Sequence, residues 1–223
     1  LDPAELEVMR QALTAIPEEM GVVLVRSAYS PNIKERRDAS CALFDPRGRM
    51  VAQAEHIPVH LGSMPVAVEM LLEKGDDVGP GDSWIVNDPY TGGSHLNDVT
   101  VISAVHDEAG DRLLGFAVNK AHHADVGGDA PGSMPAAATS LEEEGVVLHL
   151  QRLARRGEWV GEARERLLDA SRTPSERARS NSLRTASTVR GCRAARPSST
   201  RGPSPEVDRP GRRTRRRRSR PSR

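Results

Sequence analysis

The sequence is poor in cysteine and has no long apolar run. Its 223 residues include two cysteines, Cys41 and Cys192, which are too few for a framework of disulfide bonds. No apolar stretch approaches the roughly 20 residues that span a bilayer, and the N-terminus lacks a basic segment followed by an apolar one. These absences argue against a disulfide-rich protein and against a membrane protein, so we expect a cytoplasmic domain.

Lysine is missing from the last part of the chain, which is nevertheless strongly basic. Residues 179–223 contain 15 arginines and two acidic residues, a net charge of +13. Because the whole chain has a net charge of +1, residues 1–178 carry −12. The Arg/Ser/Pro-rich tail cannot bury enough apolar surface to offset the entropy of the chain. We therefore predict one domain over residues 1–178 and a disordered tail over residues 179–223.

Two explanations of the tail stay open. Apolar periodicity is lost abruptly after Ala178, which is what a shifted reading frame would produce. A genuine basic tail would instead bind phosphates electrostatically, but it has no aromatic side chain on which bases could stack. Nucleic acid is therefore not expected as a specific partner.

The first 178 residues mix separate helices with hairpins. Asp2 and Glu5 form a capping signal for a first helix, Pro17 is expected to kink or restart that helix, and Ser63 begins another. Short apolar runs predict two hairpins and one buried strand, at residues 41–44 with 50–52, 99–105 with 113–118, and 84–86. Strands and helices do not alternate regularly. The predicted fold class is therefore α+β, a mixed α/β fold with antiparallel hairpins and separate helices.

Histidine and aspartate gather between residues 87 and 128. His95 and Asp98 form an H-x-x-D pair behind two glycines that allow a sharp turn, and the adjacent His122 and His123 follow the second hairpin. Two histidines and one carboxylate leave coordination positions open for water or substrate, which is typical of catalytic manganese, iron or zinc. The alternative is structural, because H-x-x-D pairs are common and adjacent histidines often divide between core and surface.

Two further polar segments also have alternative interpretations. His56 and His60 are four residues apart, but Pro58 disfavours one continuous helix across them, so they either line the same cleft or lie in a polar loop. A run of charged side chains that includes Lys34 and Arg36 is either solvated surface or a site that binds an anion or a carboxylate.

Four segments resemble the hydantoinase B/oxoprolinase family in the same order: residues 27–38, 56–64, 87–98 and 121–128. Residues 131–134 and 144–145 fit the family as well, and the resemblance covers residues 1–178. Four long motifs in one order are far more specific than any one of them.

The resemblance implies a subunit of an ATP-dependent hydrolase that opens a hydantoin or lactam ring at an amide C–N bond, as in N-methylhydantoinase or 5-oxoprolinase. In that family an A-type partner subunit phosphorylates the substrate, so ATP would act through the partner, and the B-type subunit completes the reaction. The absence of a G-x-x-x-x-G-K-[ST] phosphate loop agrees with this division. Two alternatives remain: a subunit of an acetone- or acetophenone-type carboxylase, and an inactive truncated fragment with a basic, nucleic-acid-binding tail.

The resemblance also implies roles for single residues. The carboxylase branch implies a metal site, with manganese first and zinc or iron as alternatives, made by His95, Asp98 and His122. The implied candidates for catalysis are Asp125, His123 and Lys34. Asp125 would act as a general base or as a residue behind the metal ligands. The implied candidates for substrate binding are His56, His60, Arg36 and Asp88.

Overall fold

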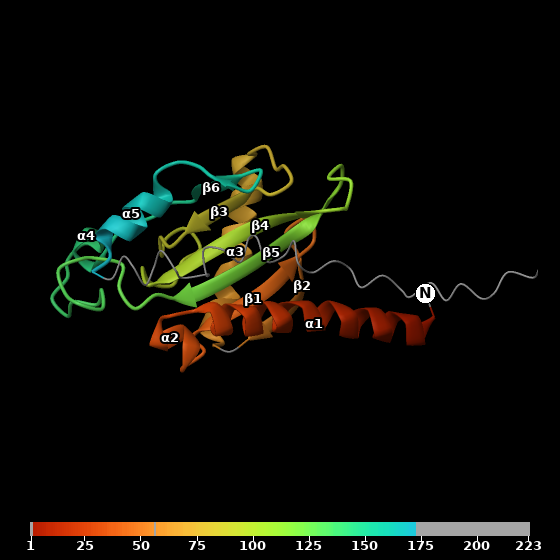
Figure 1. The fold of residues 1–223 in the computed structure, drawn as a ribbon, viewed down its shortest axis with the longest axis horizontal. Helices are drawn as coiled ribbons and strands as arrows, with labels where there is room; N and C mark the ends of the chain where they lie inside the picture. The colour runs from red at the N-terminus through yellow and green to blue at the C-terminus, as the bar shows by residue number, and fades with distance from the viewer. Residues whose placement is uncertain (1, 56, 173–223) are drawn as a thin grey trace, which may run out of the picture. The chain divides into compact units, whose positions relative to one another are not determined.

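The computed structural model of the chain describes residues 2–55 and 57–172. Within these residues, seven strands form one sheet with the order β2-β1-β5-β4-β3-β6-β7, and all paired neighbours run antiparallel. Five helices lie outside the sheet (Figure 1). The predicted α+β class is confirmed. The predicted tail at 179–223 lies outside the described residues.

Both predicted hairpins and the predicted buried strand are present. In chain order the strands are β1 (Ala39–Phe44), β2 (Met50–Glu55), β3 (Ser83–Val86), β4 (Asp98–His106), β5 (Leu113–His122), β6 (Gln151–Arg155) and β7 (Glu158–Trp159). The long strands β4 and β5 pair with each other in the middle of the sheet. Their ends therefore set the position of any site built on them.

Two helices are longer than the sequence pattern predicts, because the first does not stop at Pro17 and the third begins at Val59 instead of the predicted Ser63. The helices are α1 (Pro3–Ser27), α2 (Pro31–Lys34), α3 (Val59–Lys74), α4 (Leu141–Glu144) and α5 (Ala163–Ala170). Of the two outcomes predicted at Pro17, a restart of the helix is wrong, because α1 continues through it. A proline removes one helix hydrogen bond, but Met20 and Leu24 beyond it are buried against the sheet and stabilise the continuous helix. Among the described helices, none is long and apolar enough to cross a membrane.

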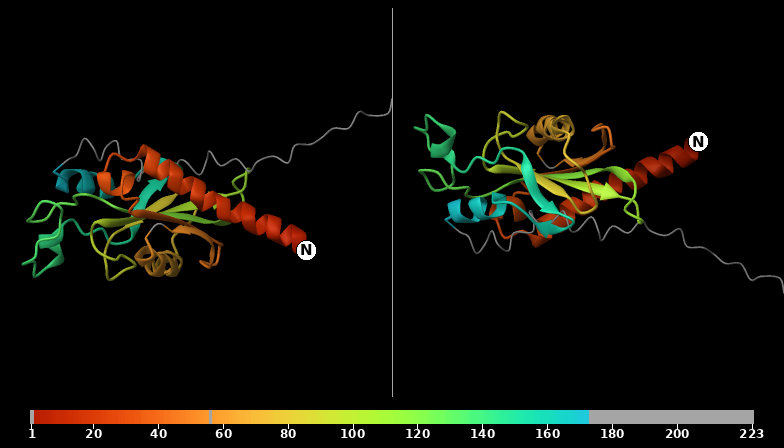
Figure 2. Two further views of the ribbon diagram at one scale, coloured as in Figure 1. Left: turned by 90° about the horizontal axis from the view of Figure 1, so that it is seen from below. Right: turned by 90° about the horizontal axis from the view of Figure 1, so that it is seen from above.

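Helices cover both faces of the sheet. On β1, Ala42 and Phe44 pack in one cluster with Met64 of α3, whereas Cys41 packs with Leu24 of α1 on the opposite face. Successive side chains of a strand point to opposite faces, which explains this division. Figure 2 shows α3 on one side of the sheet and α1 and α5 on the other. The sheet is therefore the middle layer of three.

Candidate metal centre

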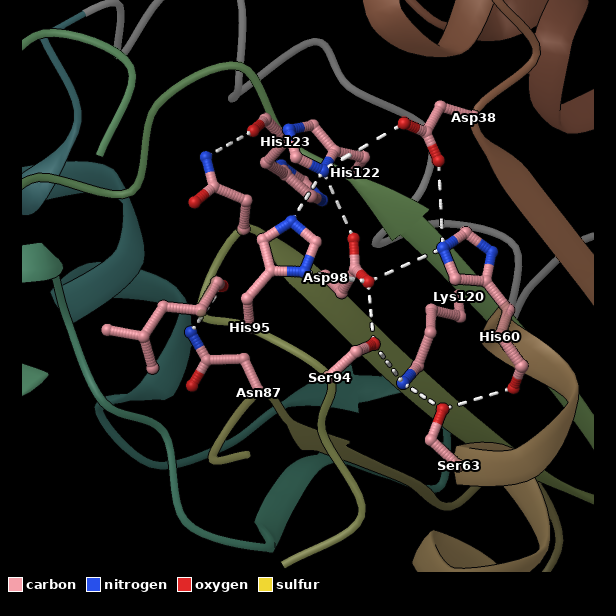
Figure 3. A network of polar contacts seen from close by, with 12 residues as sticks. Asp38, His60, Ser63, Asn87, Ser94, His95, Asp98, Lys120, His122 and His123 are labelled. Atoms are coloured by element: carbon pink, nitrogen blue, oxygen red, sulfur yellow. Dashed lines mark hydrogen bonds and ion pairs between the residues drawn. The ribbon is translucent and has the colours of Figure 1, made fainter. Parts of the chain in front are cut away.

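The ends of the two central strands bring the predicted metal ligands together. Asp98 opens β4 and His122 closes β5, and the antiparallel register places them opposite one another. His95 lies in a turn just before β4, where its carbonyl accepts the backbone N–H of Asp98 at 2.9 Å. The H-x-x-D pair and the histidine from the hairpin therefore meet at one end of the sheet (Figure 3).

The turn before His95 depends on glycine and on a buried asparagine. Gly92 has a φ of +92°, and a Cβ atom on Gly93 would lie 2.5 Å from the carbonyl oxygen of Asn87. The Asn87 side chain is buried, donates to the Leu96 carbonyl at 2.9 Å and accepts the Leu148 N–H at 2.7 Å. The Asn87 side chain therefore holds the loop in place, and only glycine leaves room for the loop backbone to approach the Asn87 carbonyl so closely.

Ligand atoms of the three residues converge. His122 Nδ1 lies 2.9 Å from His95 Nε2 and 3.1 Å from Asp98 Oδ1, and the other ring nitrogen of His95 lies 3.2 Å from Asp98 Oδ2. Atoms bound to one transition metal at about 2.1 Å stand roughly 3 to 3.4 Å apart. His95 can bind one metal through only one ring nitrogen, so this comparison applies to the two distances from His122 Nδ1. One ligand atom from each residue lies within 4.8 Å of the others, and the nitrogen and oxygen donor set fits a divalent transition metal in its chemistry.

Asp98 is the electrostatic centre of the site. Its carboxylate is fully buried, accepts a hydrogen bond from Ser94 Oγ at 2.6 Å and lies 3.4 Å from His60 Nε2. Burial opposes ionisation, but contacts with His122, His60, His95 and Ser94 together hold the pKa of Asp98 far below its usual range. The hydrogen bond with Asp98 in turn raises the pKa of His95, although partial burial opposes that shift.

His60 is a predicted substrate-binding residue that the fold brings to the triad. Its buried ring lies between two carboxylates, with Nε2 at 3.4 Å from Asp98 Oδ2 and 3.6 Å from Asp38 Oδ1, while Nδ1 lies 3.1 Å from Ser40 Oγ. Asp38 also faces His122, with 3.9 Å between Oδ2 and Nδ1. The triad is therefore backed by a second layer in which one imidazole bridges two acids (Figure 3).

A buried lysine lies on the other side of Asp98. Lys120 of β5 donates its ammonium protons to Ser63 Oγ, to Ser94 Oγ at 3.2 Å and to the Gly92 carbonyl at 3.3 Å. Burial lowers the pKa of Lys120 to about 8, although the charge of Asp98 opposes this shift. Three acceptors match the three protons of an ammonium group, so this amine is fully used inside the protein.

The other predicted substrate residues and the catalytic candidate Lys34 take different positions. Lys34 and Arg36 are exposed, at the end of α2 and just after it. Asp88 is buried, accepts a backbone N–H two residues further on at 2.9 Å and contacts His149 Nδ1 at 2.8 Å. Its contacts thus organise the loop that leads to the triad. His56 lies outside the described residues.

Asp125 and His123 follow the last ligand directly. The Asp125 carboxylate accepts two backbone N–H groups of the following loop, at 2.9 and 3.1 Å, and the guanidinium of Arg172 at 2.7 Å. Burial opposes ionisation here too, but these bonds lower the pKa of Asp125. His123 is buried, and its backbone exchanges two hydrogen bonds with Asn97. Both residues shape the loop beside the triad, and their predicted catalytic roles stay predictions.

Sequence patterns did not identify three residues of this site. Asp38 stands in a segment that resembles the family, but its own position carries no signal of a role, and Ser94 reads as part of a glycine-rich turn. Lys120 interrupts the apolar end of β5, where a charge inside a buried strand is the signal that could have found it. Their contacts come from segments far apart in the sequence.

Comparisons with known proteins agree with the resemblance. The hydantoinase B/oxoprolinase family profile matches residues 2–196. The 5-oxoprolinase of Dictyostelium discoideum is 40% identical over 177 residues, and a putative B-type subunit of a D-/L-hydantoinase from Pseudomonas sp. (strain NS671) is 36% identical over 138 residues. Among solved structures, the ATP-dependent caprolactamase from Pseudomonas jessenii superposes with a TM-score of 0.75 at 30% identity.

The matched part is a large share of this chain but a small share of its relatives. It covers 79% of this chain and 14% of the 5-oxoprolinase, and 60% of this chain and 23% of the hydantoinase subunit. For the caprolactamase the two shares are 85% and 33%. The chain therefore spans a third or less of the length of each of these three proteins.

Proposed function

Since the chain belongs to the hydantoinase B/oxoprolinase family, we propose that it is the metal-bearing part of a B-type subunit in an ATP-dependent enzyme that opens cyclic amides. The substrate would be a hydantoin or a lactam, cleaved at the ring C–N bond. An A-type partner subunit would use ATP to phosphorylate the amide oxygen. The relatives support this substrate class, because a 5-oxoprolinase, a hydantoinase subunit and a caprolactamase are all named for cyclic amides.

One observation carries the proposal, the convergence of His95, Asp98 and His122 at the end of the central strands. Two imidazoles and one carboxylate leave coordination positions open, as catalytic sites require. The His95 side chain is 40% exposed while the Asp98 side chain is fully buried. A substrate would therefore approach from the His95 side, with Asp98 at the closed end.

The chemistry needs help because an unstrained amide hydrolyses slowly, and phosphorylation of its oxygen makes the ring carbon more electrophilic. Water would add to that carbon, the ring nitrogen would leave as a protonated amine, and the resulting acyl phosphate would lose phosphate to a second water. A divalent metal held by the triad would supply a lower pKa for an attacking water. The chain's own residues would position the metal ligands and hold a proton near them. Asp98 stays anionic and holds both ligand rings, and His60, between Asp38 and Asp98, is placed to hold a proton behind the ligands.

The test is an activity assay on the full chain combined with an A-type partner. Hydantoin, 5-oxoproline and caprolactam are each supplied with ATP, and ring-opened product and ADP are measured. We expect product with at least one of them, and His95→Ala should lower its rate by more than about 100-fold, because partners behind metal ligands alone contribute about 10–100-fold. His106→Ala is the matched control, since His106 lies at the opposite end of β4 from Asp98.

Three outcomes would contradict parts of this proposal. An undiminished rate in His95→Ala would remove the metal site from the reaction. Turnover of a ketone with bicarbonate instead of a cyclic amide would establish the carboxylase alternative. Metal binding without turnover of any of these substrates would favour an inactive fragment.

A further inference from the structure

We propose that Lys120 is a positioning residue that sets the arrangement of the metal ligands by fixing two serine hydroxyls. The inference rests on the metal site proposed above and adds a residue that is not one of the three ligands. Lys120 is fully buried, and its ammonium group contacts α3 and the loop before β4 at the same time. It thereby joins three segments that carry His60, His95 and His122.

The first connection runs through Ser94 to the carboxylate ligand. Lys120 can only donate hydrogen bonds, so its contact with Ser94 Oγ at 3.2 Å makes that oxygen an acceptor. The single hydroxyl proton of Ser94 is then directed to Asp98 Oδ2, at 2.6 Å. An anionic carboxylate can only accept, so Lys120 holds the Ser94 oxygen in place while its one proton points to Asp98, and this hydrogen bond fixes the rotation of the carboxylate.

The second connection runs through Ser63 to the start of α3. Ser63 Oγ accepts from Lys120 and donates to the His60 carbonyl at 3.0 Å. The carbonyl belongs to the first turn of α3, from which the His60 ring reaches Asp98. One ammonium group thus holds both sides of the buried carboxylate (Figure 3).

The same contacts argue against other roles for this amine. A substrate-binding or nucleophilic lysine needs a free proton or lone pair that faces the substrate, whereas all three protons of Lys120 are directed at protein oxygens. A buried ammonium group is costly unless it is fully hydrogen-bonded. A methionine of similar length would fill the same space at lower cost, so the charge is explained by the hydroxyls it orients.

The experiment measures binding of Mn²⁺ alone to the full 223-residue chain after treatment with EDTA. Lys120→Met keeps the unbranched stem and removes the donors, and we expect its Kd to rise by about 10–100-fold, the usual effect of losing a partner behind a metal ligand. Ser94→Ala should raise the Kd similarly. Because Lys120 and Ser94 act on Asp98 through the same hydroxyl, the double variant should lose less affinity than the sum of the two single losses. Lys74→Met, at an exposed lysine, is the control.

The Mn²⁺ affinities of the variants and of the wild type decide whether Lys120 positions the ligands. An unchanged Kd in a folded Lys120→Met chain, or fully additive losses in the double variant, would overturn the inference while leaving the metal site intact. If Lys120→Met does not fold, Ser94→Ala decides alone, and an unchanged Kd in that variant overturns the connection to Asp98. A wild-type chain that binds no Mn²⁺ would refute the metal site itself, and the inference with it.

Discussion

Replacing His95 with alanine should perturb the proposed metal centre with little damage to the fold, because 40% of the His95 side chain is exposed. The change removes its contacts with His122 at 2.9 Å and with Asp98 at 3.2 Å. Two such hydrogen bonds, partly screened by solvent, contribute about 1–2 kcal/mol. We therefore expect the metal-free variant to melt about 2–8 °C below the wild type, at about 2–4 °C per kcal/mol for a domain of this size.

The effect of metal should be larger and should separate the two proteins. A ligand at about 100 times its Kd stabilises the folded chain by about 2.7 kcal/mol, which corresponds to roughly 5–11 °C for the wild type. His95→Ala should show no such increase at the same Mn²⁺ concentration, and His106→Ala, at the opposite end of β4 from Asp98, should behave like the wild type. Thermal melts with and without Mn²⁺, together with elemental analysis, measure this directly.

The pH dependence follows from the raised pKa of His95. A ligand imidazole must lose its proton before it binds metal, and the contact with Asp98 keeps His95 protonated above its ordinary pKa of 6.5. The apparent Mn²⁺ affinity should therefore fall as the pH drops through the raised pKa of His95. Without metal the sign reverses, because the Asp98 contact stabilises protonated His95 and this contribution is lost as the pH rises. Stoichiometric metal in both His95→Ala and Asp98→Ala would refute the site.

Two further predictions concern burial and close packing. In a Cys192→Ser chain, Cys41 is the single thiol, and burial raises its pKa to about 12. Iodoacetamide at about pH 8 should therefore react with the folded chain roughly 10³-fold more slowly than with the urea-unfolded chain. Equal rates would show that Cys41 is not buried. Gly93→Ala should weaken Mn²⁺ binding, because its Cβ would meet the Asn87 carbonyl oxygen at 2.5 Å. Gly62→Ala in α3 should leave Mn²⁺ binding unchanged, because there is open space around its Cβ. Calorimetric titration of both variants with Mn²⁺ measures the difference.

Local sequence signals were enough for the features whose cause is itself local. The capping box of Asp2 and Glu5 is present at the start of α1, because it needs only residues within one helical turn. The hairpin of β4 and β5 follows from two short apolar runs around a polar turn. The same hairpin places His122 opposite Asp98, so spacing already pointed to the three candidate ligands as neighbours, and the resemblance selected His122 rather than His123.

Predictions failed or were missing where a distant segment decides the outcome. Pro17 disfavours helix locally, but burial of Met20 and Leu24 against the sheet keeps α1 continuous. This burial cannot be deduced from the residues next to the proline, because it depends on the sheet that the helix packs against. The spacing of His56 and His60 likewise left two interpretations open, and only the packing of α3 on the sheet brings His60 to Asp98.

The sequence by itself thus determined the fold class, the family and three candidate ligands for one metal. Only the tertiary structure decided what surrounds those ligands: His60 between Asp38 and Asp98, and Lys120 behind Ser94. The physical reason is that ligand spacing along a hairpin is a local property of the chain. The pKa values and orientations of the ligands depend instead on buried charges that the fold collects from separate segments.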